Sequence, residues 1–292
     1  MKIATAAYSL DFLDSWAGYE DKVFKWVDEA ASHGAAVLVF PEYAAMELAT
    51  LEGRAAAMDL QASSRAVSDR MADANALHAH LATEFGVYIL GGSAPVFDDR
   101  FGLVNRAHFF APSGESDHQD KQIMTRYERN PWQVGGGGPL KVFETSFGKV
   151  GVLICYDSEF PLLGRALSEC ELLLVPSCTE ALSGYWRVRI GAMARALEGQ
   201  CVTAMSSLVG AADWSEAVDV NTGAGGVFGP PDTGFPQTGV LAEGVLNQPG
   251  WTYADVDLDA VRQVRADGQV LNRTHWSEQT PRDSEVTYIS LA

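Results

Sequence analysis

Residues 149–161 read KVGVLICYDSEFP, in which an apolar run leads directly to a cysteine. Residues 150–154 are all apolar or small, as in a strand that is buried on both faces of a sheet. Cys155 follows them at once, and a polar run from Tyr156 to Glu159 comes next. Sites in open α/β sheets form at the carboxyl ends of strands. Cys155 is therefore either a small core residue or a nucleophile at the rim of a sheet.

Strand and helix patterns alternate on both sides of this stretch. We expect strands and helices in turn at 2–9, 18–34, 35–40, 63–85, 87–93 and 101–112, and again at 141–145, 149–155, 160–169, 172–177, 184–199 and 200–207. Shorter strands are expected around Gly226–Phe228 and at 239–244 and 251–256, and residues 272–292 read as a polar tail with a strand at VTYIS (286–290). Two such series predict an α/β protein with a four-layer α-β-β-α sandwich of two mixed sheets. No linker interrupts the pattern, so residues 1–292 are expected to form a single domain.

Composition narrows the class of protein. The chain has 292 residues, 47% of them hydrophobic, and a formal net charge of -17, which argues against nucleic-acid binding because phosphate backbones are repelled. No apolar run approaches 18 residues and the start lacks the core of a signal peptide, so no membrane association is expected. The four cysteines form no CxxC pair and favour a reducing, cytoplasmic setting. The histidines show no metal-ligand spacing, so neither a metal nor another cofactor is expected.

Two charged residues share the strand-end position of Cys155. Glu42 follows the apolar segment VLVFP, and Lys121 stands in DKQIMTRYERNPW (120–132), after the strand at 101–112 and a polar loop. A thiol is only a few per cent ionised at neutral pH and needs a base or a positive neighbour, and no histidine comes directly after a buried strand. Taken alone, Glu42 or Lys121 is more often a solvated surface charge, and Cys155 an inert core thiol. Their order along the chain is what makes them a candidate constellation.

Glu in FPEY, Lys near the middle and Cys in GVLICYDSEFP together resemble the nitrilase, or carbon–nitrogen hydrolase, superfamily. The resemblance extends over nearly the whole chain, including LLLVPS (172–177) and the ARALEGQC (194–201) helix end. It implies the α-β-β-α sandwich and a catalytic triad of Glu42, Lys121 and Cys155. It also implies a second glutamate a few residues after the lysine, which is matched to Glu128.

The triad implied by the resemblance has a defined chemistry. Cys155 attacks a carbonyl or nitrile carbon, and Glu42 takes the thiol proton and passes it to the departing nitrogen. Lys121 and the backbone N–H of Tyr156 stabilise the oxyanion, while Glu128 positions Lys121 or the substrate nitrogen. The product is a thioester that water then cleaves. The predicted activity is an amidase-type hydrolase that releases ammonia or an amine from a small amide or carbamoyl amine.

Four residues are expected to contact the substrate. Tyr156 contributes its backbone, Trp132 walls the site or else packs in the core, and Thr179 follows the strand LLLVPS. Family members that act on dicarboxylate monoamides often carry an arginine shortly after Cys-Tyr-Asp, whereas this chain has Ser158 and Glu159, which argues against such a substrate. Glu159 either faces the pocket, favouring a cationic or neutral amide, or forms a local ion pair.

Other functions remain open on the sequence. A nitrilase or an acyltransferase would use the same triad, and a non-catalytic binding protein could keep the fold. Within the family, VPSCTEALSGYWRVRIGAMARALE (175–198) looks most like a branch sometimes fused to acetyltransferase domains, for which this chain has no room. The resemblance also implies a homodimer or higher homo-oligomer, using the helices at Gly164–Glu169 and Arg189–Glu198 and the C-terminal tail.

Overall fold

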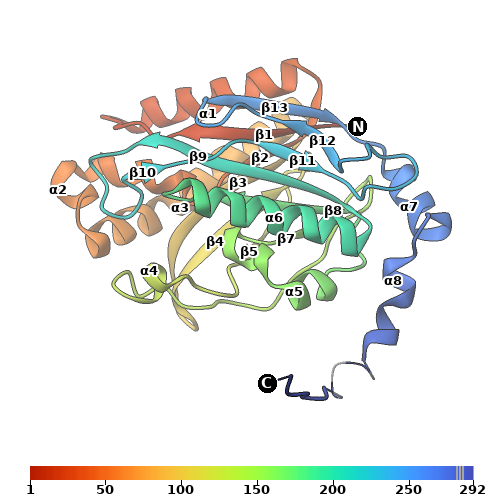
Figure 1. Ribbon diagram of the computed structural model, residues 1–292. Coiled ribbons are helices and arrows are strands. Elements are labelled where there is room, and N and C mark those ends of the chain that lie inside the picture. The colour runs from red at the N-terminus through yellow and green to blue at the C-terminus, as the bar shows by residue number, and fades with distance from the viewer. Residues whose placement is uncertain (281, 283, 285, 292) are drawn as a thin grey trace.

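The structure is a computed structural model that describes residues 1–280, 282, 284 and 286–291. Its strands are joined by hydrogen bonds into one large, curled mixed sheet, with the central order β5-β4-β3-β2-β1-β9-β8-β7-β6 (Figure 1). The strands are β1 (Lys2–Ser9), β2 (Ala35–Phe40), β3 (Tyr88–Asp98), β4 (Gly102–Phe110), β5 (Ser116–Asp120), β6 (Phe143–Glu144), β7 (Lys149–Val152), β8 (Leu172–Ser177), β9 (Val202–Ala211), β10 (Val220–Asn221), β11 (Gly226–Phe228), β12 (Val240–Glu243) and β13 (Gly250–Asp255).

Helices connect the parallel strands and cover the sheet. The α-helices are α1 (Trp16–Ser32), α2 (Arg54–Ala57), α3 (Leu60–Phe85), α4 (Arg126–Arg129), α5 (Pro161–Ala166), α6 (Leu182–Gly199), α7 (Leu258–Asp267) and α8 (Asn272–His275), and the 3-10 helices are η1 (Ala44–Glu52), η2 (Cys155–Glu159) and η3 (Trp276–Gln279). The two long helices α1 and α3 begin at capping side chains, Ser15 and Asp59, which accept first-turn N–H groups. Among the described residues, no helix is both long and apolar enough to cross a membrane.

Two large apolar clusters lie on opposite faces of the first strands. In β2, Leu38 and Phe40 pack in a cluster with α1 and α3 residues, whereas Val37 and Val39 belong to a second cluster with residues of β7, β8, β9 and α6. Both faces of β2 are therefore buried, which explains why AAVLVF is apolar without alternation.

Strand direction places the ends of several strands at one edge. β1 is parallel to β2 and β9, and β8 is parallel to β7 and β9. β3 is parallel to β2, and two antiparallel pairings, β3 with β4 and β4 with β5, return β5 to the same direction. The carboxyl ends of β2, β5, β7 and β8 consequently point the same way.

The predicted α/β class is confirmed, but several expected boundaries are wrong. The hydrogen bonds link all strands into one sheet, so two separate sheets are not seen in the pairing. The strand expected at 149–155 ends at Val152, because the chain turns into η2 at Cys155. The polar loop expected before Lys121 is β5, which pairs with β4. Residues 286–290, where a strand was expected, are described by the structure and carry no strand.

Candidate active site

The three strand-end residues singled out in the sequence lie at the same edge of the sheet. Glu42 is two residues beyond β2, Lys121 directly follows β5, and Cys155 is three residues beyond β7. All three side chains are buried in the protein. The structure therefore brings together residues that are up to 113 positions apart in the sequence.

Cys155 lies in a turn after β7 and no longer has the strand conformation. Its φ is 49°, in the left-handed region that a residue with a Cβ rarely adopts, so neighbouring contacts must hold it there. The Asp157 N–H donates to the carbonyl oxygen of Ile154 at 3.0 Å, and the Ser158 hydroxyl donates to the carbonyl oxygen of Cys155 at 2.6 Å. These two hydrogen bonds brace the turn, and a strained turn also carries the nucleophile in other hydrolases.

Helix α6 packs against this turn. Arg195 donates from Nη1 to the carbonyl oxygen of Ser158 at 2.7 Å. Gly191 lies so near that a Cβ on it would stand 2.8 Å from the same oxygen, so only glycine permits this approach. The helix GYWRVRIGAMARALEG (184–199) is thus in direct contact with the backbone beside Cys155.

Asp157 ties the cysteine turn to the segment that carries Lys121. Its carboxylate accepts the backbone N–H groups of Gln122, at 3.1 and 3.2 Å, and of Ile123, at 2.8 Å. Burial raises the pKa of Asp157 to about 7, although the nearby Lys121 charge and these N–H groups act to lower it. The polar run after Cys155 therefore fixes the backbone that follows Lys121.

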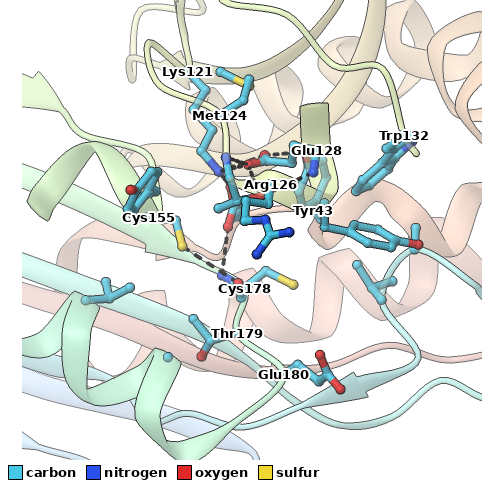
Figure 2. A pocket seen from close by; sticks show the side chains of 18 of the residues that line it. Tyr43, Lys121, Met124, Arg126, Glu128, Trp132, Cys155, Cys178, Thr179 and Glu180 are labelled. Carbon is cyan, nitrogen blue, oxygen red and sulfur yellow. Dashed lines mark hydrogen bonds and ion pairs between the residues drawn. The ribbon is translucent and has the colours of Figure 1, made fainter. Parts of the chain in front are cut away.

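Lys121 is enclosed by two carboxylates (Figure 2). Its Nζ lies 2.7 Å from Oε1 of Glu42 and 2.7 Å from each carboxylate oxygen of Glu128. Lys121 is 1% exposed, Glu42 1% and Glu128 3%. One buried cation therefore faces two buried anions, with Cys155 beside them.

Further donors bind Glu42. The amide of Asn105 donates to its Oε1 at 2.9 Å, and the backbone N–H of Cys178 donates to its Oε2 at 2.9 Å. The sequence analysis missed Asn105, although a polar side chain inside the apolar strand GLVNRAHFF was the available signal. The role of the Cys178 backbone carries no sequence signal, because any residue supplies an N–H.

Glu128 has its own donors. The Tyr43 hydroxyl donates to Oε1 at 2.8 Å, and the N–H and hydroxyl of Thr125 donate to Oε2 at 2.9 and 2.8 Å. Thr125 and Glu128 also form a capping box at the start of α4, so T-x-x-E was a readable signal for both. Tyr43 was missed, although it directly follows Glu42.

The pKa values of these groups follow from burial and charge. Burial raises the pKa of Glu42 and the negative charge of Glu128 raises it further, against the lowering effect of Lys121. Burial opposes the charge of Lys121, but Glu42 and Glu128 outweigh it and hold the Lys121 pKa well above its usual value. Burial acts to raise the pKa of Glu128, but the positive charge and hydrogen bond of Lys121, helped by Thr125 and Tyr43, hold it below its usual value. Burial and then the Glu42 charge raise the pKa of the Cys155 thiol, so the resting residue is a thiol next to a carboxylate of elevated pKa.

The cluster forms the floor of an open cleft of about 1130 Å³, which is lined also by Tyr156, Trp132, Glu159 and Thr179. Trp132 is 1% exposed, stacks near Tyr43 with ring centroids 4.6 Å apart, and donates from its indole N–H to Ser64 at 2.8 Å. It therefore both lines the cleft and packs in the core, where the sequence had left these as alternatives.

The other predicted contact residues lie on the cleft wall. The Tyr156 ring packs edge-on against Phe160. The Thr179 hydroxyl donates to the carbonyl oxygen of Thr222 at 2.7 Å. Glu159 lines the cleft and also lies 3.4 Å from the Nε of Arg187, so it has the expected local ion pair while part of its side chain faces the cleft.

The remaining cleft wall is charged but mixed in sign. Outside the floor it carries three arginines and four carboxylates, and Arg126 points into the opening in Figure 2. Within the part of the chain that the structure describes, no group of three or more His, Cys, Asp or Glu side chains is arranged to hold a metal ion.

The chain is similar to known proteins over most of its length. Residues 2–266 match the family model described as carbon–nitrogen hydrolase. The chain is 32% identical over 273 residues to the probable hydrolase YhcX of Bacillus subtilis, covering 92% of this chain and 52% of that protein. It is 28% identical over 198 residues to the omega-amidase NIT2 of Xenopus tropicalis, covering 64% of this chain and 67% of that protein. The chain thus spans about half the length of the Bacillus relative.

Solved structures share the fold. A mutant of the amidase from Nesterenkonia sp. AN1, with acrylamide added to its active-site cysteine, superposes with a TM-score of 0.68 at 24% identity, covering 91% of this chain and 97% of that chain. Nit3 of Saccharomyces cerevisiae, a nitrilase-superfamily member, superposes with a TM-score of 0.70 at 19% identity, covering 91% and 93%. These two likenesses bear on the fold alone.

Proposed function

The chain belongs to the carbon–nitrogen hydrolase family, and from this premise we propose that it is an amidase-type enzyme using Cys155 as its nucleophile. It cleaves the C–N bond of a small amide or carbamoyl amine through a thioester and releases ammonia or an amine. The observation that carries the proposal is the buried cluster in which Lys121 lies 2.7 Å from both Glu42 and Glu128 beside the thiol. No histidine is needed, because a carboxylate of elevated pKa can serve as the base.

In the first half of the reaction, Glu42 accepts the Cys155 proton as the sulfur attacks the substrate carbonyl carbon. The carbonyl oxygen becomes an oxyanion, which the Lys121 ammonium and the Tyr156 N–H stabilise. As a first-turn group of η2, the N–H of Tyr156 has no acceptor within its own helix. Such stabilisation commonly contributes a few kcal/mol. Glu42 then passes its proton to the departing nitrogen, and a thioester remains.

In the second half, water replaces the amine. Glu42, again ionised, takes a proton from water as the oxygen attacks the thioester carbon, and the thiolate leaves with that proton. The acid product departs and the resting thiol is restored. Glu128 holds Lys121 in place throughout, since both of its oxygens contact the ammonium.

The test is ammonia release from a panel of small amides, carbamoyl amines and nitriles, run beside Cys155→Ala. We expect release from at least one amide or carbamoyl amine, lost in the variant, with an acylated Cys155 peptide detectable by mass spectrometry. Product analysis with an added amine separates hydrolysis from acyl transfer, because a transferase forms the new amide in preference to the acid. Release that persists in Cys155→Ala would contradict the proposal.

For the substrate, we propose a cationic or neutral amide, with Glu159 facing the substrate group that lies beyond the scissile bond. The support is its position on the cleft wall with a side chain 22% exposed, next to Arg187, which is 60% exposed and lies 3.4 Å away. Glu159→Gln should reduce turnover of amine-bearing amides more than that of neutral ones. An unchanged preference between the two would remove Glu159 from substrate selection.

For the architecture, we propose a single domain whose curled sheet acts as two layers packed face to face, giving four layers, α-β-β-α. The second apolar cluster supports this, since it joins Val37 and Val39 of β2 to residues of β7, β8 and β9. The proposed domain comprises residues 1–292, and in its C-terminal part residues 281, 283, 285 and 292 lie outside the described residues. We also propose a cytoplasmic setting, supported by four cysteines that are all free.

For assembly, we propose a homodimer or higher homo-oligomer through α5, α6 and the tail. Leu182, Trp186 and Ile190 recur every fourth residue on α6 and are 48%, 48% and 61% exposed, and Leu162 on α5 is 73% exposed. Exposed apolar residues gathered on one face are typical of an interface. Sedimentation showing only monomer at micromolar concentration would refute this.

Within the family, we propose that the chain belongs to the branch sometimes fused to acetyltransferase domains, on the basis of the segment 175–198.

A further inference from the structure

Asn105 is a polar residue at the centre of an apolar strand. It lies in β4 opposite Pro95 of β3 and is 0% exposed. Its amide nitrogen lies 2.9 Å from Oε1 of Glu42 and 3.5 Å from Oε1 of Glu128. Those are the same two oxygens that Lys121 binds. Asn105 therefore spans the two carboxylates from the side of the sheet.

The backbone of Asn105 is part of the same arrangement. Its carbonyl oxygen accepts the backbone N–H of Lys121 at 2.9 Å. One residue thus contacts the lysine through its main chain and both glutamates through its side chain. A shift of Asn105 would move all three groups relative to Cys155.

We propose that Asn105 is a positioning residue whose amide nitrogen keeps the Glu42 carboxylate ionised and oriented toward the Cys155 thiol. This inference rests on the proposed role of Glu42 as the base. The amide is suited to the task because it donates a hydrogen bond without adding charge. A second cation would neutralise the cluster and weaken Glu42 as a base, whereas an apolar residue would leave Lys121 as the sole donor to that oxygen.

The side-chain oxygen of Asn105 argues that this residue does more than stabilise the fold. Within the described residues, Oδ1 of Asn105 is buried and has no hydrogen-bond donor. A buried, unpaired acceptor lowers the stability of the fold. An apolar side chain of similar size would avoid that cost, so stability alone does not account for asparagine at this position.

Several ionisable groups surround Glu42 and set its pKa together with Asn105. Glu128 raises it by repulsion, Lys121 lowers it, and burial raises it. The groups that interact electrostatically with Glu42 come from η2, α4 and the segments after β2, β5 and β8: Tyr43, Lys121, Glu128, Cys155, Asp157 and Cys178. Removing the neutral donor leaves these charges unchanged, so the pKa of Glu42 should rise.

The experiment follows alkylation of Cys155 by iodoacetate, which contains no amide, against pH in the full chain, read by mass spectrometry of the Cys155 peptide. This readout needs no amide substrate, and peptide mapping separates Cys155 from Cys178, which also lines the cleft. In Asn105→Leu we expect the midpoint of the pH–rate profile to rise by about one unit, as loss of one hydrogen bond to the charged form implies. At neutral pH the rate should fall about tenfold.

Gln119→Leu is the matched control. Gln119 is a buried amide on the adjacent strand β5 that donates to the carbonyl oxygens of Asp120 and Pro139, away from the glutamates. We expect Gln119→Leu to lower Tm without moving the midpoint, and Asn105→Leu to move the midpoint with a smaller loss of Tm. If Asn105→Leu does not fold, Asn105→Asp replaces it and should raise the midpoint further by adding a third carboxylate.

The inference is overturned if both Asn105 variants alkylate with the wild-type midpoint, or if Asn105→Leu loses Tm more than Gln119→Leu with no change of midpoint. Failure of the proposed function looks different. In that case, wild-type Cys155 alkylates with a measurable midpoint but releases no ammonia from any amide, and the effect of Asn105 on the midpoint can still be read.

Discussion

Glu128→Gln isolates the effect of charge on the base. The side chain keeps its size and can still accept from Lys121, but it loses the negative charge beside Glu42. The Glu42 and Glu128 oxygens each lie 2.7 Å from the same Nζ, so they are at most twice that distance apart. At an effective dielectric constant of about 20, like charges about 5 Å apart repel by roughly 3 kcal/mol. That is about two pKa units.

The sign of the effect is fixed by the proposed mechanism. Glu42 must be ionised to take the thiol proton, so kcat/KM rises with pH through the Glu42 pKa. Repulsion from Glu128 is one of the causes that raise this pKa. Removing it should move the acid limb of the kcat/KM profile down by about one to two pH units. The same change should lower kcat by about ten- to a hundredfold, because Lys121 loses one of its two anionic contacts.

The assay is the pH dependence of kcat/KM on the best amide of the panel, with Thr125→Val as the control. Thr125→Val removes one hydroxyl donor from Glu128 but keeps its charge, so the limb should not move down. If the acid limb of the kcat/KM profile stays in place in Glu128→Gln, the pKa that this limb reports is not that of Glu42. That result would point instead to Asp157, whose pKa is about 7 and whose carboxylate is bound to backbone N–H groups.

Three further outcomes follow from the same contacts. Lys121→Met should abolish detectable turnover and lower the free energy of unfolding by about 3–5 kcal/mol, because two buried carboxylates lose their cation. Denaturant unfolding measures this loss, and an unfolding midpoint equal to that of the wild type would contradict it. Asp157 has a folded-state pKa raised from 3.8 to about 7, so its contribution to stability is present below pH 4 and is lost as the pH rises to 7. The Tm of Asp157→Asn minus that of the wild type should therefore increase from pH 4 to pH 7 and then level off, and a flat difference would exclude this titration. Gly191→Ala should cost about 1–3 kcal/mol and most of the activity, since the new methyl group would press on the carbonyl oxygen of Ser158 2.8 Å away; full activity would show that η2 can shift freely.

The sequence placed the main chemical groups correctly at strand ends. Glu42 and Cys155 each follow a continuously apolar run, and such runs form buried strands for local reasons of hydrophobic burial. The order of glutamate, lysine and cysteine then carried the resemblance to the family. Glu128 was also within reach, because its capping box with Thr125 is a local pattern.

Local patterns could not give the contacts that join separate strands. Asn105 touches Glu42 only because β4 lies near the end of β2, and Asp157 binds the Lys121 segment only because η2 lies beside the loop after β5. The strand expected through Cys155 was wrong for a related reason. Its left-handed turn depends on Ser158 and on Gly191 and Arg195, which lie 36 and 40 residues further along the chain.

What the sequence determined by itself is the alternation of strands and helices and the residue types at the strand ends, because both depend on neighbours along the chain. What only the tertiary structure decided is the state of the cluster: one lysine between two carboxylates, an amide spanning both, and a thiol of raised pKa at the floor of a cleft. Electrostatic energy depends on distance and burial in space. Neither quantity exists until strands distant in sequence have packed together.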